Sequence, residues 1–193
     1  MDEQQFVTEL IKGDEQAFRK LVKEYKDQVY NTCIGLLRNA EDAEDTAQEV
    51  FIEVHNSIDT FNGKASLSTW IYRIAVNKSL ELIRYRKRKK RFTYFKALMN
   101  FDGETDEIED FNGFVHPGIE LENKERAKIL MDAIGRLPES QKVAFTLHKI
   151  EGLSYKNISE VMEKSLSAIE SLIYRARQNL KDDLYDYYKE EGS

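Results

Sequence analysis

The residues of this chain most suited to a specific chemistry form a run of positive side chains. Residues 84–91 read RYRKRKKR, in which every position except Tyr85 is lysine or arginine. A few cations are enough to offset the dipole at a helix end, and a run this dense repels itself in the free protein. A polyanionic partner therefore explains it better than a solvated helix end. The run predicts a phosphate-binding segment, which supplies affinity but carries no sequence information.

Aromatic rings and hydrogen-bond donors occur together just upstream of this run. Trp70 and Tyr72 occur at helical spacing with Arg73, Asn77 and Lys78. Rings and donors together can capture exposed bases and the backbone of single-stranded nucleic acid. A lone tryptophan at the start of an amphipathic helix is at least as readily a core residue, so the donors are the favoured contacts.

Negative charge is concentrated elsewhere in the chain. The formal net charge of −6 on its own argues against a nucleic-acid partner, but residues 102–122 hold many acids and no lysine or arginine. Residues 41–54 are also rich in acids. For an arbitrary protein such an acidic helix is an ordinary solvated face, but the segregation of charge implies different partners for different segments.

No constellation of residues points to catalysis. His55, His116 and His148 lie far apart in the sequence, and neither a glycine-rich phosphate loop nor a metal-ligand spacing occurs. Cys33 is the only cysteine, which excludes an internal disulfide, and its apolar helical setting predicts a core residue. No enzyme activity, cofactor or metal is expected.

The elements that must position these residues are helices, because apolar residues recur at helical spacing and no segment alternates like a strand. The pattern predicts an all-α protein of two small helical domains joined by an acidic flexible linker. We place the first domain at 1–95, the linker at 96–122 and the second domain at 123–193. The expected helices are a short one ending at Gly13, followed by 15–38, 41–58, 69–91, 127–137, 140–150, 154–162 and 166–184.

The last two of these helices predict a helix-turn-helix, in which two short helices cross at an apolar joint after a three-residue turn. The second helix would enter the major groove, where its outward side chains could bond to bases or phosphates. A plain four-helix domain with a solvated face fits the same pattern. The candidate DNA contacts of this domain are Ser154, Tyr155, Lys156, Ser167, Glu170, Ser171, Tyr174, Arg175 and Lys181.

Several segments resemble a known family. The segment SYKNISEVMEKSLSAIESLIYRARQNLK, preceded by LPESQKVAFTLHKIEGLS, resembles the promoter-binding domain of bacterial sigma factors. DAEDTAQEVFIEVHNSIDTF resembles the polymerase-binding helix of the short extracytoplasmic-function group. FNGKASLSTWIYRIAVNKSLELIRYRKRKK resembles its promoter-melting segment. Together these matches cover most of residues 14–184.

The resemblance implies a non-catalytic protein that binds core RNA polymerase, directs it to a promoter and helps to open the duplex. In the family, the loop that matches residues 62–67 forms a pocket for a flipped base of the minus-ten element, and the second domain reads the minus-thirty-five element. The implied minus-ten contacts are Asn62, Lys64, Ser66, Arg73, Asn77, Lys78, Arg84 and Arg88.

The resemblance also implies protein partners. In the family, the helix that matches residues 41–54 docks on a coiled coil of the largest polymerase subunit, and the polymerase flap is a further contact. The other implied partners are promoter DNA, both double-stranded and melted, and an anti-sigma factor. The implied polymerase-facing residues are Asp42, Asp45, Gln48, Glu49 and Glu53.

Three residues depart from the family pattern in the helix-turn-helix. Glu163 stands where a turn glycine is common, and Glu170 and Leu172 stand where basic residues are usual. At positive φ, Glu163 would cost roughly 1 kcal/mol. Glu170 would accept from cytosine, and Leu172 cannot hydrogen-bond at all, so no promoter sequence carries over.

Two other functions fit parts of the pattern. One is a helix-turn-helix regulator that binds an operator without polymerase, and the other is a helical adaptor whose basic run binds RNA. The chain starts Met1, Asp2, Glu3, unlike a secretion signal, and no apolar stretch approaches the roughly 20 residues of a membrane span. We therefore expect a cytoplasmic protein without membrane insertion.

Overall fold

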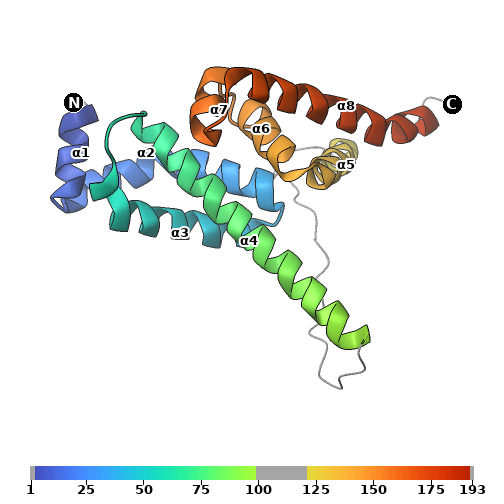
Figure 1. Ribbon diagram of the computed structural model, residues 1–193, viewed down its shortest axis with the longest axis horizontal. Helices are drawn as coiled ribbons and strands as arrows, with labels where there is room; N and C mark the ends of the chain where they lie inside the picture. The colour runs from blue at the N-terminus through green and yellow to red at the C-terminus, as the bar shows by residue number, and fades with distance from the viewer. Residues whose placement is uncertain (1–2, 99–120, 192–193) are drawn as a thin grey trace.

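The computed structural model describes residues 3–98 and 121–191, and every regular element in these ranges is helical (Figure 1). This confirms the prediction of an all-α protein. The prediction of a flexible linker over 96–122 falls mainly on residues outside the described ranges. Of that span, the structure describes only the last turn of one helix, up to Leu98, and the start of the next at Leu121.

The first domain contains four α-helices and a short 3₁₀ helix in the described part of the chain. Side chains at the helix starts accept hydrogen bonds from free backbone N–H groups, as capping residues do. Asp14 accepts from Gln16 and Ala17 at the start of the second α-helix, and Ser66 accepts from Thr69 at the start of the fourth. The elements are α1 (Glu3–Ile11), α2 (Glu15–Leu37), α3 (Ala40–Ser57), η1 (Ile58–Thr60) and α4 (Leu67–Leu98).

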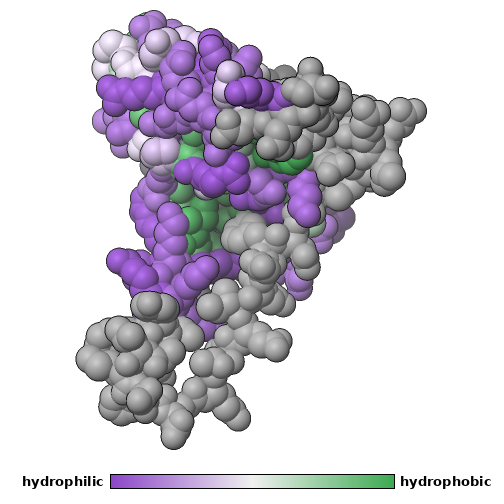
Figure 2. All heavy atoms as spheres, turned by 90° about the vertical axis from the view of Figure 1, so that its right-hand side faces the viewer, coloured by the Kyte–Doolittle hydropathy of each residue, from purple (hydrophilic) through white to green (hydrophobic). Residues whose placement is uncertain are grey.

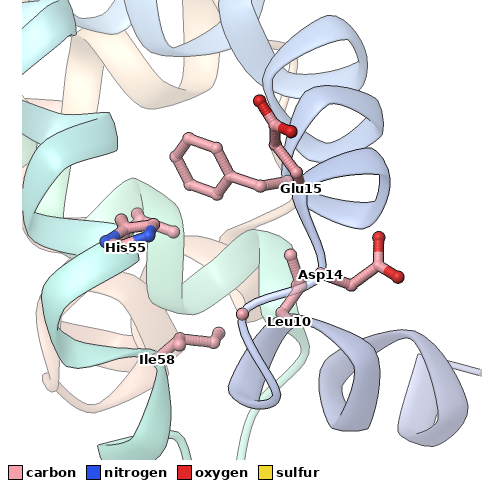
Figure 3. A pocket seen from close by; sticks show the side chains of 8 residues that line it. Leu10, Asp14, Glu15, His55 and Ile58 are labelled. Carbon is pink, nitrogen blue, oxygen red and sulfur yellow. The ribbon is translucent and has the colours of Figure 1, made fainter.

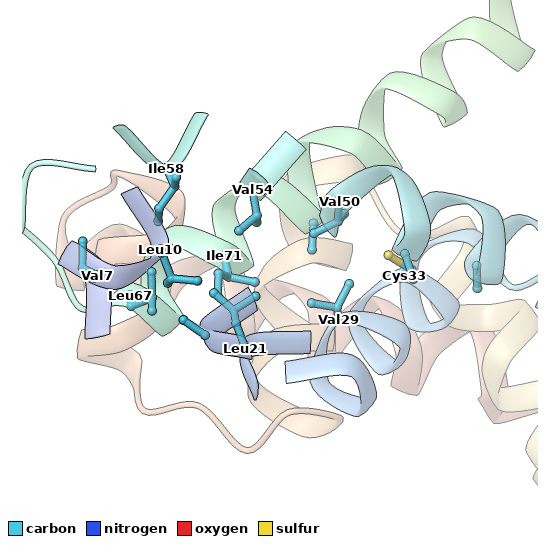
Figure 4. Packing of buried hydrophobic residues seen from close by; sticks show 14 of the residues in the cluster. Val7, Leu10, Leu21, Val29, Cys33, Val50, Val54, Ile58, Leu67 and Ile71 are labelled. Carbon is cyan, nitrogen blue, oxygen red and sulfur yellow. The ribbon is translucent and has the colours of Figure 1, made fainter. Parts of the chain in front are cut away.

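Helices α2, α3 and α4 enclose the core of the first domain (Figure 4). Each helix contributes fully buried side chains to this core, for example Leu21 of α2, Val50 of α3 and Ile71 of α4. Cys33 is buried in the same cluster, as predicted, and this burial raises the pKa of its thiol to about 11. Trp70 packs partly buried against the core, with its ring tilted on that of Phe61. This supports the core role for the tryptophan.

The second domain contains four helices in the described residues. Three of them start earlier or end later than the periodicity predicted: the first begins at Leu121, the second begins one residue early at Glu139, and the last ends at Glu191. In this last helix the helical turns continue beyond the buried Leu180. The turn between the last two helices covers three residues, as predicted, and its first residue, Glu163, has φ 51°. The elements are α5 (Leu121–Arg136), α6 (Glu139–Lys149), α7 (Tyr155–Met162) and α8 (Leu166–Glu191).

The two domains pack against each other, which the sequence did not predict. Figure 1 shows α6 and α7 lying beside α2 and α4. One apolar cluster contains Tyr72 and Val76 of α4 together with Leu147 of α6 and Ile158 of α7. Gly35 allows the close approach of α2, because a Cβ there would lie 2.7 Å from side-chain atoms of Thr146 and Ile150.

The surface of the described residues is mostly polar, as expected when the apolar side chains pack into cores. Seen from the right-hand side of Figure 1, the described surface is mostly hydrophilic, with apolar side chains showing near its centre (Figure 2). Within residues 3–98 and 121–191, no helix is both long enough and apolar enough to cross a membrane.

Candidate nucleic-acid interface

The basic run lies on the exposed second half of α4, which extends away from the body of the first domain (Figure 1). Two of its arginines already hold carboxylates of other helices. Arg84 pairs with Glu139 of α6 at an Nη2–Oε1 distance of 2.5 Å, and Arg86 pairs with Asp42 of α3. The run is therefore a dense, largely solvent-facing cationic surface that also reaches two neighbouring helices.

Exposed cations of this run should contribute non-specific affinity. Replacing Lys87, Arg88 and Lys90 with alanine should weaken binding to every promoter fragment by a similar factor. The slope of log affinity against log salt should also flatten by roughly 0.9 for each phosphate that the variant no longer neutralises. Titration of duplex DNA at several salt concentrations measures this slope. Alanine at Lys23 and Lys26, exposed on α2, is the matched control, and an unchanged slope would reject the phosphate role.

The loop before α4 is open to solvent and locally ordered by its own polar side chains. The Asn62 side chain accepts from the backbone N–H of Lys64 at 3.1 Å, and Lys64 is exposed. Ser66 shares hydrogen bonds with Ser68 and Thr69 at the helix start. The loop side chains predicted to meet the minus-ten element are thus accessible.

The middle of α4 differs from this open loop. Asn77 is exposed, whereas Lys78 pairs with Glu53 of α3 at 3.1 Å. Arg73 is half-buried, and its guanidinium bonds to α7 and to the turn that follows it. Tyr72 is 7% exposed. In this arrangement only part of the predicted minus-ten surface faces solvent.

All but one of the predicted contacts of the second domain are exposed to solvent, the exception being the half-buried Tyr155. Ser154 caps α7 by accepting from the Asn157 N–H, and the ring of Tyr155 packs edge-on against His148. The side chains of α8 that face outward are exposed, with Tyr174 at 64%. The exposed predicted contacts in this domain are Ser154, Lys156, Ser167, Glu170, Ser171, Tyr174, Arg175 and Lys181.

The departures from the family pattern have structural explanations in two cases. Glu163 does adopt positive φ, a conformation that strains a residue other than glycine. Leu172 packs partly buried against the apolar cluster shared by the two domains, so its side chain serves the core and not the DNA face. Glu170 stays exposed on α8, where a carboxylate can accept from a base.

Base reading by α8 should be detectable as unequal losses. Arg175→Ala should weaken binding to some minus-thirty-five sequences more than to others, because a guanidinium that bonds to a base edge discriminates among bases. Affinity for a panel of single-base variants measures the effect. Arg177→Ala, at another exposed arginine of the same helix, is the control, and equal losses on every sequence would make Arg175 a backbone contact.

The predicted polymerase-facing residues all lie on α3. Asp45, Gln48 and Glu49 lie on this helix, whereas Asp42 and Glu53 are held by Arg86 and Lys78 of α4. Sequence reasoning missed Ile52, whose side chain is 60% exposed on the same helix. An exposed apolar residue bordered by carboxylates is typical of a protein contact. The sequence does contain a sign of this, because Ile52 is an apolar residue that does not belong to the periodic set of buried positions on α3.

A second feature missed in the sequence is an open apolar groove between α6 and α8. It has a volume of about 660 Å³, and its rim is basic. Leu180 and Leu184 of the groove continue the periodic apolar stripe of α8, and periodicity alone does not distinguish a groove from a core. The groove is lined by Phe145, Lys149, Arg177, Leu180, Lys181, Leu184, Tyr185 and Lys189.

A smaller cavity in the first domain holds no set of groups suited to chemistry. It encloses about 80 Å³ between the start of α2 and the end of α3 (Figure 3). Its His55 packs edge-on against Phe18, and Asp14 is occupied as the cap of α2. Among the residues that the structure describes, no group of three or more histidine, cysteine, aspartate or glutamate side chains is placed to hold a metal ion.

Lys142 of α6 is a buried cation beside charged residues of the first domain. Lys142 of α6 is only 9% exposed, and burial lowers its pKa to about 8, helped by the nearby charges of Lys87 and Arg38 and opposed by Glu139. The native state therefore disfavours the protonated amine, whose pKa in the unfolded chain is about 10.5. At neutral pH this lysine lowers the stability of the fold.

Lys142→Met should raise the free energy of unfolding at pH 7 by about 1 kcal/mol after allowance for solvent screening. Between pH 8 and 10.5 the unfolded chain keeps a proton that the native lysine has lost, so the wild type gains stability and the advantage of the variant shrinks. Denaturant titrations at these pH values measure the difference between the two proteins. Lys149 is exposed on the same helix, so Lys149→Met should leave the free energy of unfolding unchanged at each pH. A gain independent of pH would contradict the titration.

Comparison with protein families matches both domains. Residues 21–89 match the model of sigma-70 region 2, and residues 127–180 match that of sigma-70 region 4. The first match contains α3 and most of the basic run of α4, and the second contains the helix-turn-helix.

Relatives match along nearly the whole chain. The chain is 32% identical over 193 residues to the ECF RNA polymerase sigma-E factor of Haemophilus influenzae, covering 95% of this chain and 96% of the relative. It is 31% identical over 180 residues to the ECF RNA polymerase sigma factor SigW of Bacillus subtilis, covering 93% and 95%.

Solved structures share the fold. CnrH in complex with the cytosolic domain of CnrY matches with a TM-score of 0.68 at 20% identity, over 95% of this chain and 97% of that chain. The sigma factor RpoE of Bartonella quintana, solved with the anti-sigma factor NepR, matches with a TM-score of 0.66 at 21% identity, over 87% and 96%.

Proposed function

The chain belongs to the extracytoplasmic-function group of sigma-70 factors, alternative sigma factors that direct promoter-specific transcription, and from this premise we propose how its surfaces divide the work. The first domain reads and melts the minus-ten element, and the second reads the minus-thirty-five element. The observation that carries this proposal is the presence of two separate exposed surfaces with nucleic-acid chemistry, the loop and tail of α4 and the outer face of α8. They correspond to the domains proposed at 1–95 and 123–193.

The steps on DNA follow from the chemistry of each surface. The basic run of α4 holds phosphates and sets position without reading sequence. Asn62, Lys64, Ser66 and Asn77 face the exposed bases of the melted strand, and Arg73 joins them once it is accessible. The α8 face donates and accepts hydrogen bonds in the major groove. No covalent bond is made or broken by the protein, and no cofactor is needed.

Core polymerase is the protein partner in this proposal. The carboxylates of α3, with the exposed Ile52 among them, fit the coiled coil of the largest subunit. The groove between α6 and α8 fits an apolar segment of the flap, because it offers apolar surface inside a polar rim. An anti-sigma factor and a cytoplasmic location complete the assignment.

Reconstitution tests the proposal directly. Adding the full chain to core polymerase and transcribing genomic fragments should give initiation at a defined set of promoters, with the minus-ten region open to permanganate. Core polymerase alone is the control. Specific binding of an operator by the chain alone, without initiation from the reconstituted enzyme, would favour the operator-binding regulator. Binding of RNA without promoter initiation would favour the adaptor.

A further inference from the structure

Arg73 of α4 is held by the second domain through three nitrogen atoms. Its Nε and Nη2 donate to the backbone carbonyl of Glu160 at 3.1 and 2.6 Å, and its Nη1 lies 2.9 Å from the Glu163 carboxylate. All three nitrogens of the guanidinium are therefore engaged at one corner of the helix-turn-helix. An arginine bound in this way is fixed at this corner by three of its five N–H groups, so it has to leave the corner before it can meet a strand bound elsewhere.

The residue that completes this contact is also the strained one. Glu163 has φ 51°, a conformation in which glycine would incur no penalty. Glycine supplies no carboxylate, so it would form the turn of α7 but not the ion pair with Arg73. The benefit of glutamate at this position therefore lies in the contact across the domains, and not in the turn itself.

The surrounding contacts cover the same part of α4. The Tyr72 hydroxyl donates to Glu151 at 2.8 Å, and Arg84 pairs with Glu139. Each of these α4 side chains has chemistry suited to DNA, and each meets an acid of the second domain. The outer face of α8 stays exposed in the same arrangement, with Tyr174 at 64%.

We infer that this arrangement is a self-masked form of the free protein, in which Glu163 acts as a latch that holds Arg73 away from the minus-ten strand. The inference rests on the proposed function, since it needs Arg73 to be a DNA contact. Docking on polymerase has to separate the corner of α7 from α4 before the strand can bind. The free chain then binds duplex through α8 and the basic run but binds the melted minus-ten strand poorly.

Removing the carboxylate tests the latch. The probe is a single-stranded oligonucleotide with the non-template minus-ten sequence of a promoter that the reconstituted enzyme transcribes. Free Glu163→Gln should bind it about five-fold more tightly than the wild type, the factor expected from removing one partly exposed ion pair. In the holoenzyme, where the domains are already apart, the two proteins should bind equally. Asp182→Asn, which removes one exposed acid of α8 that lies outside the predicted DNA contacts, is the matched control.

A second variant opens the same contact by volume instead of charge. Gly35→Val forces side-chain atoms against Thr146 and Ile150 and so pushes the domains apart. Arg73 and Glu163 themselves are not substituted. The variant should raise the radius of gyration in small-angle scattering and give the same gain in strand affinity, with an unchanged helical circular dichroism spectrum. Greater expansion without any gain in affinity would overturn the masking.

Failure of the latch and failure of the proposed function are separable. Arg73→Ala in the holoenzyme should reduce promoter opening if the arginine contacts the minus-ten strand. If it does so while free Glu163→Gln binds no more tightly than the Asp182→Asn control, the latch is wrong and the function stands. If Arg73→Ala leaves promoter opening unchanged, the role of Arg73 in the proposed function fails instead.

Discussion

Replacing Leu147 with alanine should lower the free energy of unfolding by about 2–5 kcal/mol. Leu147 is fully buried in α6, and its cluster includes Tyr72 and Val76 of the first domain. The loss should therefore combine the transfer free energy of the missing methyl groups with a cavity at the joint of the domains. Denaturant titration followed by circular dichroism measures the loss.

The position of Leu147 also predicts how the variant unfolds. Because one cluster joins both domains, the wild type should unfold in a single transition. Leu147→Ala should therefore also lower the denaturant concentration at which the first domain unfolds. Leu130→Ala, at an apolar position of α5 that is 40% exposed, is the control and should cost far less. A loss confined to the second domain would show that the shared cluster contributes nothing to cooperativity.

Reversing charge on α3 should have the largest effect on partner binding. Asp45→Lys combined with Glu49→Lys should weaken binding of core polymerase about 100-fold, equivalent to about 2.7 kcal/mol, because the complementary potential becomes repulsive. The ion pairs of Asp42 with Arg86 and of Glu53 with Lys78, which join α3 to α4, do not involve either residue. Competition against a labelled wild-type protein for core polymerase measures the loss.

The control for this double variant reverses two acids elsewhere on the first domain. Glu24 and Asp27 lie on α2, so their replacement by lysine changes the net charge equally. An equal loss for both double variants would mean that total charge governs the encounter and that α3 is not the docking surface. Full retention of affinity in the α3 variant would also reject that surface.

The helices were predictable because each presents a periodic apolar stripe to a core. The periodicity of α4 could not show, however, that its stripe serves two cores. Ile71 and Ala75 face the first domain, whereas Tyr72 and Val76 face the second. Periodicity identifies an apolar position but not the residues that it contacts, so the packing of the two domains could not be predicted from it.

The candidate site divides in the same way. The density of charge in the basic run and the position of Glu163 in the turn were visible along the sequence. The carboxylates that hold Arg73 and Arg84 are separated from them by many residues, and no local pattern connects them. The groove between α6 and α8 was missed because Leu180 and Leu184 fit a core stripe equally well.

Helix α4 carries the start of the minus-ten surface and the basic run on one continuous element, from Leu67 to Leu98. At roughly 1.5 Å per residue, Arg73 and Arg88 are separated by about 22 Å along its axis. That span corresponds to about six to seven base-pair steps of roughly 3.4 Å. Under the proposed function, this helix therefore sets the distance between the point where the strands separate and the point where the basic run binds the intact duplex. A residue inserted between Arg73 and Arg88 should then change where the bubble begins.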